Sequence, residues 1–242
     1  MRYLLGSGYY HPDPENDEFV SRWARIFERY ANPKPTIRII IGVNNSRIRF
    51  DEKNRDNMLA CESRALILMK YEQIVLQGNN GHVGQLISGE KKNKFCGWSM
   101  AFLTGAMIAY QNETDYIWLE QDCLAFGPWV ERTYADMGDG DMVFGHKMKT
   151  APFMPCSQSL VLVRHSFIPE MVSAYLGMGT DNDVTNLPEA KFQKLEDQFG
   201  DRIRRLSFGC DRERPIPYDD EVFYAQKLTD EELETLKQKG KL

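Results

Sequence analysis

The chain has 242 residues, of which 42% are hydrophobic and 12% aromatic, and these proportions are those of a globular protein with one sizeable core. The net charge of −5 argues against non-specific nucleic-acid binding, which needs a basic face. The five cysteines are scattered without a zinc-ligand spacing, so neither a zinc site nor a disulfide framework is expected.

The first half of the chain alternates strand-like and helix-like patterns. Four short apolar runs, each ending in a polar or glycine-rich cluster, are predicted to be strands. These runs are residues 2–10, 36–46, 72–81 and 116–119. Helical spacing or length predicts helices between them, at 17–31, 56–69 and 97–110.

This alternation predicts the α/β class, with a mainly parallel sheet, right-handed crossovers and helices on both faces. Ligands of such sheets bind beyond the C-terminal ends of the strands. The predicted strands end in the clusters GSGYY, GVNNS, GNNG and EQD. The sequence therefore predicts a binding site along this rim.

The last of these clusters contains two carboxylates, Glu120 and Asp122. Side chains i and i+2 of a strand point the same way, so the two carboxylates are expected to converge on one point. That point is either a cation or a set of hydroxyl groups. The alternative is a polar strand end whose acids are simply solvated.

The second half is less regular. Strands are predicted at 141–146, 157–165 and 201–209, and helices at 167–176, 188–199, 219–228 and 229–240. Thr229 and Glu232 form a capping box, and Gly240 is a suitable helix stop. The sequence contains no linker or repeat, so residues 1–242 are predicted to form a single domain.

The element order, GVNNS, QGNNGHVGQL and the acid-x-acid motif after the fourth strand resemble a GT-A-type glycosyltransferase, over roughly residues 1–165. The resemblance implies a GT-A-like fold, with residues 1–125 as the nucleotide-sugar-binding half and 126–242 as a C-terminal acceptor-side half. It implies transfer of a sugar from a nucleoside-diphosphate sugar to a hydroxyl-bearing glycan or lipid-linked acceptor, in surface glycan or polysaccharide assembly.

The resemblance also implies that the acid-x-acid motif holds a divalent cation, Mn²⁺ or Mg²⁺, against the diphosphate. Two carboxylates alone repel a diphosphate, whereas a cation between them attracts it and stabilises the leaving group. Asp122 is predicted to bind the metal directly, and Glu120 to bind the metal or the ribose. The family motif usually begins with Asp, which is one methylene shorter than Glu120, and the family's late histidine ligand has no counterpart after His165.

Other nucleotide-sugar contacts are predicted along the same rim. The glycines of 78–84 let backbone N–H groups approach a ribose or diphosphate, or simply form a flexible turn. Asparagine amides after the second strand can bind a base edge or ribose. A tyrosine after the first strand stacks on the base or packs in the core, and a lysine of 89–94 neutralises phosphate or is solvated. The predicted residues are Gly6, Tyr9, Asn44, Asn45, Asn79, Asn80, Gly81 and Lys94.

A second acidic cluster, Asp219, Asp220 and Glu221, is predicted to open a helix, where acids stabilise the positive end of the dipole. The resemblance implies a catalytic acid pair at the start of a late helix, followed by a basic residue and a leucine, here Lys227 and Leu228. Asp220 or Glu221 is therefore predicted to be the general base that deprotonates the acceptor hydroxyl.

Two other functions stay open. A nucleotidyltransferase that makes the activated sugar usually has Arg and Lys directly after the first strand, and GSGYYHPDPEND has neither. The other is a non-catalytic nucleotide- or sugar-binding module.

No apolar run approaches the about 20 residues that span a bilayer, and the N-terminus lacks a signal-peptide core, so a cytoplasmic protein with at most peripheral membrane contact is expected.

Overall fold

The computed structural model describes residues 1–9, 18–42, 58–61, 73–77, 97–145, 155–181, 186–210 and 212–242. The described strands are β1 (Tyr3–Tyr9), β2 (Ile37–Gly42), β3 (Met58–Cys61), β4 (Gln73–Gln77), β5 (Asp115–Leu119), β6 (Cys123–Phe126), β7 (Met142–Gly145), β8 (Ser157–Val163), β9 (Ile203–Arg205) and β10 (Phe223–Gln226). The described helices are α1 (Glu18–Tyr30), α3 (Gly97–Gln111), α4 (Trp129–Met137), α5 (Ile168–Gly177), α6 (Pro188–Phe199) and α7 (Asp230–Gln238).

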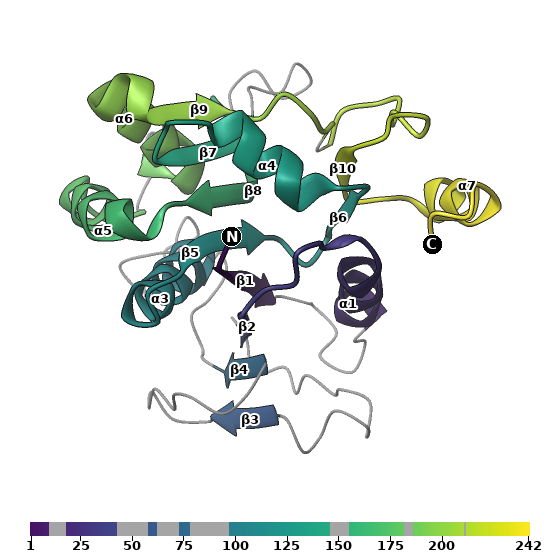
Figure 1. The fold of residues 1–242 in the computed structure, drawn as a ribbon, viewed down its shortest axis with the longest axis horizontal. Coiled ribbons are helices and arrows are strands. Elements are labelled where there is room, and N and C mark those ends of the chain that lie inside the picture. Colours follow the sequence, from purple (N-terminus) through teal and green to yellow (C-terminus); the bar gives the residue numbers. More distant parts are fainter. Residues whose placement is uncertain are drawn as a thin grey trace.

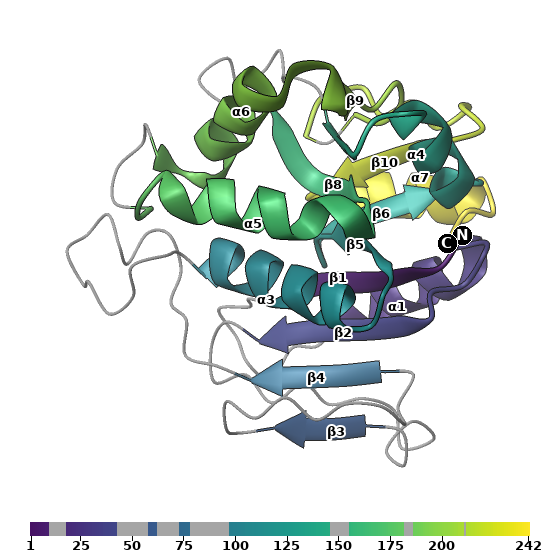
Figure 2. The same cartoon turned by 60° about the vertical axis from the view of Figure 1, so that its left-hand side comes forward.

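Eight strands form one sheet in the order β3-β4-β2-β1-β5-β8-β7-β9. The pairs from β3 to β5 are all parallel, and Figure 2 shows β2, β4 and β3 side by side and pointing the same way. β8 is antiparallel to both β5 and β7, and β9 is parallel to β7. The prediction of a mainly parallel α/β sheet is confirmed.

The chain reverses its direction of travel across the sheet beside β1. From β1 it moves outward through β2 to β3 and β4, and it then returns to the opposite side of β1 to form β5. Such a switch point leaves a crevice at the C-terminal ends of the two strands, where open α/β sheets bind their ligands. Glu120 directly follows β5 at this position.

Alternating side chains of the central strands face two separate cores. Ile117 and Leu119 of β5 pack with residues of α1 and α4, whereas Tyr116 and Trp118 pack with residues of α3, α5 and α6. Helices therefore cover both faces of the sheet, as the sequence predicts (Figure 1). The alternation also decides the face of Glu120, because it lies two residues after Trp118.

β6 and β10 form a separate two-stranded antiparallel sheet, with Gln226 opposite Cys123 and Phe223 opposite Phe126. Gly127 then turns the chain at φ +72°, and a Cβ there would lie 1.9 Å from the carbonyl oxygen of Glu221. Only glycine fits this close approach. The helix predicted at 219–228 is therefore wrong, because the aromatic run there pairs with β6 as a strand.

A second correction concerns the helix predicted at 56–69. Residues 58–61 of that range form β3, which is parallel to β4, while the rest of the range lies outside the described residues. β6 and α4 were not predicted. The other predicted elements are observed with shifted ends, and the capping box of Thr229 and Glu232 is present at the start of α7.

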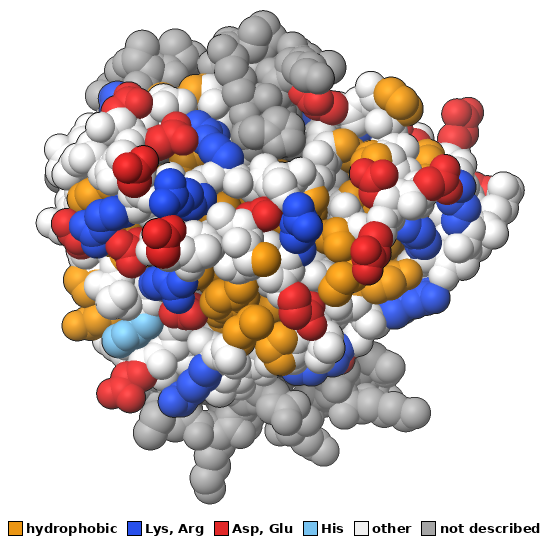
Figure 3. All heavy atoms as spheres, turned by 45° about the horizontal axis from the view of Figure 1, so that its top comes forward, with side chains coloured by type: hydrophobic (Ala, Val, Ile, Leu, Met, Phe, Trp, Pro, Cys, Tyr) orange, Lys and Arg blue, Asp and Glu red, His pale blue; other side chains and the backbone are white. Residues whose placement is uncertain are grey.

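Three of the five cysteines lie in the described part of the core. Cys123, Cys156 and Cys210 are buried and form no disulfide within the described residues, and burial raises the pKa of the Cys156 thiol to about 12. Acidic and basic side chains are interspersed on the face shown in Figure 3, without an extended basic area there. Within the described ranges, none of the helices has the length and apolarity to cross a bilayer.

Candidate functional site

The two carboxylates predicted to converge do meet at one side chain. The side-chain amide nitrogen of Gln226 donates to Glu120 Oε2 and also to Asp122 Oδ1, the latter at 2.9 Å. The β6–β10 sheet makes this contact possible, because it places Gln226 beside the start of β6. The carboxylates that follow β5 are therefore held by the last residue of β10.

Glu120 is nearly buried, with 8% of its surface exposed, and donors surround its carboxylate. The indole Nε1 of Trp98 donates to its Oε1 at 2.5 Å, and the hydroxyl of Ser159 donates to its Oε2 at 3.4 Å. Together with Gln226, these donors satisfy a charge that burial would otherwise penalise. Glu120 is thus held in a fixed orientation.

Trp98 is itself held by aromatic packing at the start of α3. Its ring stacks on Phe102 with centroids 5.0 Å apart, and it meets Trp118 and Phe192 edge-on at 5.2 and 5.6 Å. These contacts leave the indole N–H directed at Glu120. Helices α3 and α6 therefore take part in positioning a carboxylate at the end of β5.

The orientation of the Gln226 amide is decided by Arg212. The guanidinium Nε of Arg212 donates to Gln226 Oε1 at 2.7 Å. A flipped amide would direct its NH₂ group at the guanidinium, so the NH₂ group must face the two carboxylates. Gln226 is 2% exposed, and its contacts are therefore shielded from bulk water.

A cation shared by both carboxylates does not fit this arrangement, because an N–H donor occupies the point where they converge. Asp122 alone is a suitable ligand, since its Oδ2 accepts no hydrogen bond within the described part of the chain and the residue is only partly buried. One carboxylate together with phosphate oxygens and waters is a common Mg²⁺ ligand set. Groups of three or more potential ligands among His, Cys, Asp and Glu are absent from the described residues.

The other predicted nucleotide contacts lie mostly outside the described residues. Asn44, Asn45, Asn79, Asn80, Gly81 and Lys94 fall in undescribed ranges. Tyr9 ends β1, on the rim beside the switch point, but its side chain is not among those described.

Gly6 lies within β1 instead of at the rim. A Cβ on Gly6 would lie 2.6 Å from the hydroxyl oxygen of Tyr116, so its missing side chain makes room for that ring. The structure therefore gives Gly6 a packing role in the sheet.

The acidic cluster of Asp219, Asp220 and Glu221 is not brought to Glu120 and Asp122. Its three side chains are exposed in the turn before β10, whereas Gln226 contacts the carboxylates from the end of that strand. At about 3.3 Å per residue, the five residues from Glu221 to Gln226 span roughly 16 Å. Asp219 pairs with Lys239 at 2.5 Å, and this ammonium lowers the pKa of Asp219.

This placement predicts that Asp220→Asn and Glu221→Gln each keep near-parental turnover. Both substitutions remove one charge and retain the size of the side chain. Loss of a general base would instead lower the rate by about 10²–10⁴-fold. A loss of that size in either variant, with an unchanged melting temperature, would restore the catalytic role that the sequence predicts.

The sequence did not identify Trp98, Ser159, Arg212 or Gln226 as parts of this site. A signal for Gln226 exists in the run VFYAQ, where aromatic residues favour a strand and a polar residue ends it. Arg212 and Ser159 carry no such local signal, because pairing with distant segments brings them to the site.

Comparison with known proteins supports the fold. No protein-family model matches the sequence, and no curated protein matches it either. Among solved structures, the chain is similar to the galactosyltransferase LgtC in complex with donor and acceptor sugar analogues. The TM-score is 0.51 and the identity 11%, over 95% of this chain and 88% of LgtC.

An active-site mutant of LgtC gives a TM-score of 0.50 at 12% identity, with the same coverage of 95% and 88%. Mouse xyloside xylosyltransferase 1 gives a TM-score of 0.42 at 10% identity, over 86% of each chain. The two LgtC comparisons have the higher TM-scores and carry the structural likeness. This chain therefore has the fold of the GT-A-type glycosyltransferases.

Proposed function

We propose that the protein is a glycosyltransferase that moves a sugar from a nucleoside-diphosphate sugar to a hydroxyl group of an acceptor. The observation that carries the proposal is the pair of fixed carboxylates, Glu120 and Asp122, at the switch point of a GT-A-type sheet. Ligands of open α/β sheets bind at this position. The fold likeness to LgtC supports the same reaction class.

In the proposed reaction, the acceptor oxygen forms a bond to the anomeric carbon of the donor sugar. The bond between that carbon and the diphosphate oxygen breaks, and the hydroxyl proton leaves to a base that is not assigned. Negative charge grows on the departing diphosphate. Charge stabilisation at that point is the largest contribution that such a site can make to the rate.

The chain's own residues have distinct roles in this proposal. Glu120, held by Trp98 and Gln226, is fixed beside the proposed donor site and would orient a ribose or sugar hydroxyl there. Asp122 would hold a divalent cation, Mn²⁺ or Mg²⁺, through Oδ2. Such an ion, when bound, neutralises diphosphate charge.

The experiment that tests the proposal is a thermal-shift screen of the intact protein with UDP, GDP, TDP and ADP, each with and without Mn²⁺. A ligand that binds only the native state raises the melting temperature by mass action. We expect at least one nucleoside diphosphate to raise it, and more strongly with Mn²⁺ than without.

Turnover then separates the alternatives that the sequence leaves open. Hydrolysis or transfer of the corresponding nucleotide-sugar, with release of the nucleoside diphosphate, supports the transferase. Release of pyrophosphate from a nucleoside triphosphate and a sugar phosphate would show a nucleotidyltransferase. Stabilisation without any turnover would show a binding module, and no stabilisation by any nucleotide would contradict the proposal.

A further inference from the structure

A pocket lies between helices α1 and α7, and neither Glu120 nor Asp122 lines it. It has a volume of about 760 Å³, within the range of small-molecule sites. Its lining residues are Arg22, Arg25, Ile26, Arg29, Asp230, Leu233, Glu234, Lys237 and Leu242. Four of these side chains are cationic and two are anionic, so the pocket is basic in a chain whose net charge is −5.

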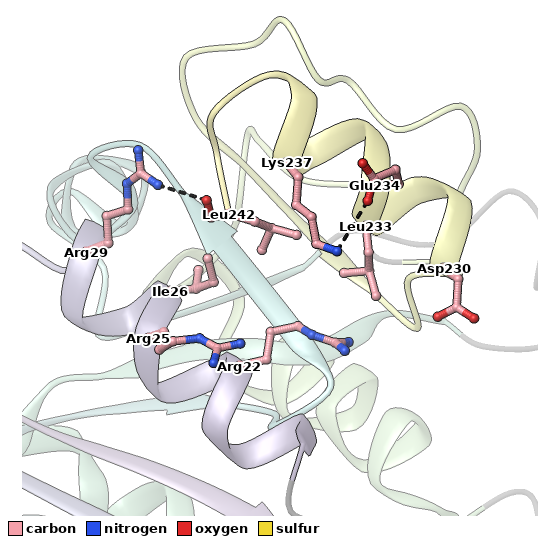
Figure 4. A pocket seen from close by; sticks show the side chains of 9 residues that line it. All are labelled: Arg22, Arg25, Ile26, Arg29, Asp230, Leu233, Glu234, Lys237 and Leu242. Atoms are coloured by element: carbon pink, nitrogen blue, oxygen red, sulfur yellow. Dashed lines mark hydrogen bonds and ion pairs between the residues drawn. The ribbon is translucent and has the colours of Figure 1, made fainter.

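The arginines of the pocket share one face of α1. Arg22, Arg25 and Arg29 follow at the spacing i, i+3 and i+7, which places them one above another along about 10 Å of helix. Figure 4 shows Arg22 and Arg25 extending from α1 along the opening, with Lys237 reaching toward it from α7. Cationic groups therefore approach the pocket from both walls.

Arg29 closes one end of the pocket. Its guanidinium donates to the backbone oxygens of Gly240 and Leu242, at 2.7 and 3.3 Å, and so ties α1 to the segment after α7. Ile26, Leu233 and Leu242 add apolar surface. The pocket thus combines an apolar wall with a row of positive charge.

Arg25 is accessible to a ligand of this pocket. Arg25 is exposed and makes no hydrogen bond or ion pair with any residue in the described part of the chain. Arg22 lies about one helical turn away on the same face of α1. A bound phosphate would engage the planar guanidinium groups, which match phosphate oxygens in a bidentate geometry.

We propose that the pocket between α1 and α7 binds a ligand that carries a phosphate or diphosphate group. Arg22, Arg25 and Lys237 contact the phosphate oxygens, and the apolar wall contacts the adjoining part of the ligand. A phosphate group fits better than a carboxylate, because it offers oxygens to three separate cations at once. This inference does not depend on the proposed transfer activity.

The test is isothermal titration of the intact protein with inorganic pyrophosphate in EDTA, which removes divalent cations from the carboxylate site. We expect saturable binding that Arg25→Gln and Arg22→Gln each weaken about tenfold, because each removes a charge-assisted hydrogen bond. Asp122→Asn should leave this binding unchanged, which separates the pocket from the carboxylate site. Arg204→Gln is the matched control, since it removes one exposed positive charge on β9, where Arg204 pairs with Asp139.

Two further arms identify the ligand's source. Sedimentation with phosphatidylcholine vesicles, with and without phosphatidic acid, tests for a lipid headgroup, and glucose 1-phosphate tests for a soluble phosphate ester. The proposal would be overturned if acetate bound as tightly as pyrophosphate, or if pyrophosphate showed no saturable binding. It would also be overturned if Arg204→Gln weakened pyrophosphate binding as much as Arg25→Gln does. Melting temperatures near the parental value are expected, because Arg25 is exposed and Gln is a good helix former.

Discussion

Replacing Asp122 by asparagine is expected to lower sugar transfer at least about a hundredfold, because the variant would hold much less tightly the divalent cation whose charge stabilises the departing diphosphate. The substitution keeps the size of the side chain, and Oδ1 can still accept the hydrogen bond from Gln226. The site should therefore keep its shape while losing one negative charge. The measurement is kcat and KM for the donor that the thermal-shift screen identifies, with and without Mn²⁺.

The matched control is Asp139→Asn. Asp139 is an exposed aspartate that pairs with Arg204 and does not contact Glu120 or Asp122. This variant should transfer sugar at the parental rate. Both variants should melt near the parental temperature, because neither carboxylate is buried. Equal rates in the Asp122 variant and the parent, with Mn²⁺ present, would show that Asp122 has no part in the reaction.

The parallel half of the sheet could be predicted from local patterns. Isoleucine-rich and aromatic runs such as 36–46 and 116–119 are typical of buried strands, and glycine or polar clusters end them. The helices 17–31 and 97–110 have spacing or length that excludes strands. Order along the chain then predicts parallel pairing and a ligand site at the strand ends.

Two strands were interpreted as helices for physical reasons. Residues 58–61, MLAC, have good helix propensity, and their pairing with β4 overrides it. The start of 219–228 has three acids, which favour a helix N-terminus, yet the aromatic residues that follow pair with β6. That pairing joins Gln226 to Cys123 across about a hundred residues, and no local pattern reports it.

The candidate site, like the fold, could be predicted from local patterns only in part. The i and i+2 spacing predicts that Glu120 and Asp122 converge, and both do accept from Gln226, although residues 121 and 122 form a turn and do not continue β5. The group at the convergence point depends on the β6–β10 pairing, so the sequence could not show that it is the amide of Gln226. The amide of Gln226 lies between the two carboxylates, and a metal held by Asp122 stays a prediction.

The largest effect on stability is expected at a buried ion pair on the opposite side of the sheet from α1. Lys191 of α6 and Asp181 are both fully buried, with Lys191 Nζ 2.7 Å from Asp181 Oδ1. The same ammonium donates to the carbonyl oxygen of Gly179 at 2.6 Å and lies 4.8 Å from the ring centroid of Tyr175. Burying a charge this deeply costs free energy, and the ion pair and hydrogen bond made by the ammonium offset that cost.

Lys191→Met keeps the length of the side chain and leaves the carboxylate of Asp181 buried without its ion-pair partner. We expect the free energy of unfolding to fall by about 3–5 kcal/mol, which is a large share of the stability of a typical domain. Urea denaturation at neutral pH measures it. The double variant Lys191→Met with Asp181→Leu should recover most of the loss, because an apolar pair of similar volume avoids the desolvation cost.

Lys194→Met is the matched control, because Lys194 lies on the same helix and its exposed ammonium bonds only to Asn186 Oδ1, at 3.1 Å, among the described residues. Its cost should stay within about 0.5 kcal/mol, as for most surface substitutions. The buried pair also concerns the site, because α6 places Phe192 against the ring of Trp98, which donates to Glu120. Lys191→Met should therefore also raise KM for the donor, whereas Lys194→Met should not. Equal losses of stability in the two variants would show that the buried pair does not anchor α6.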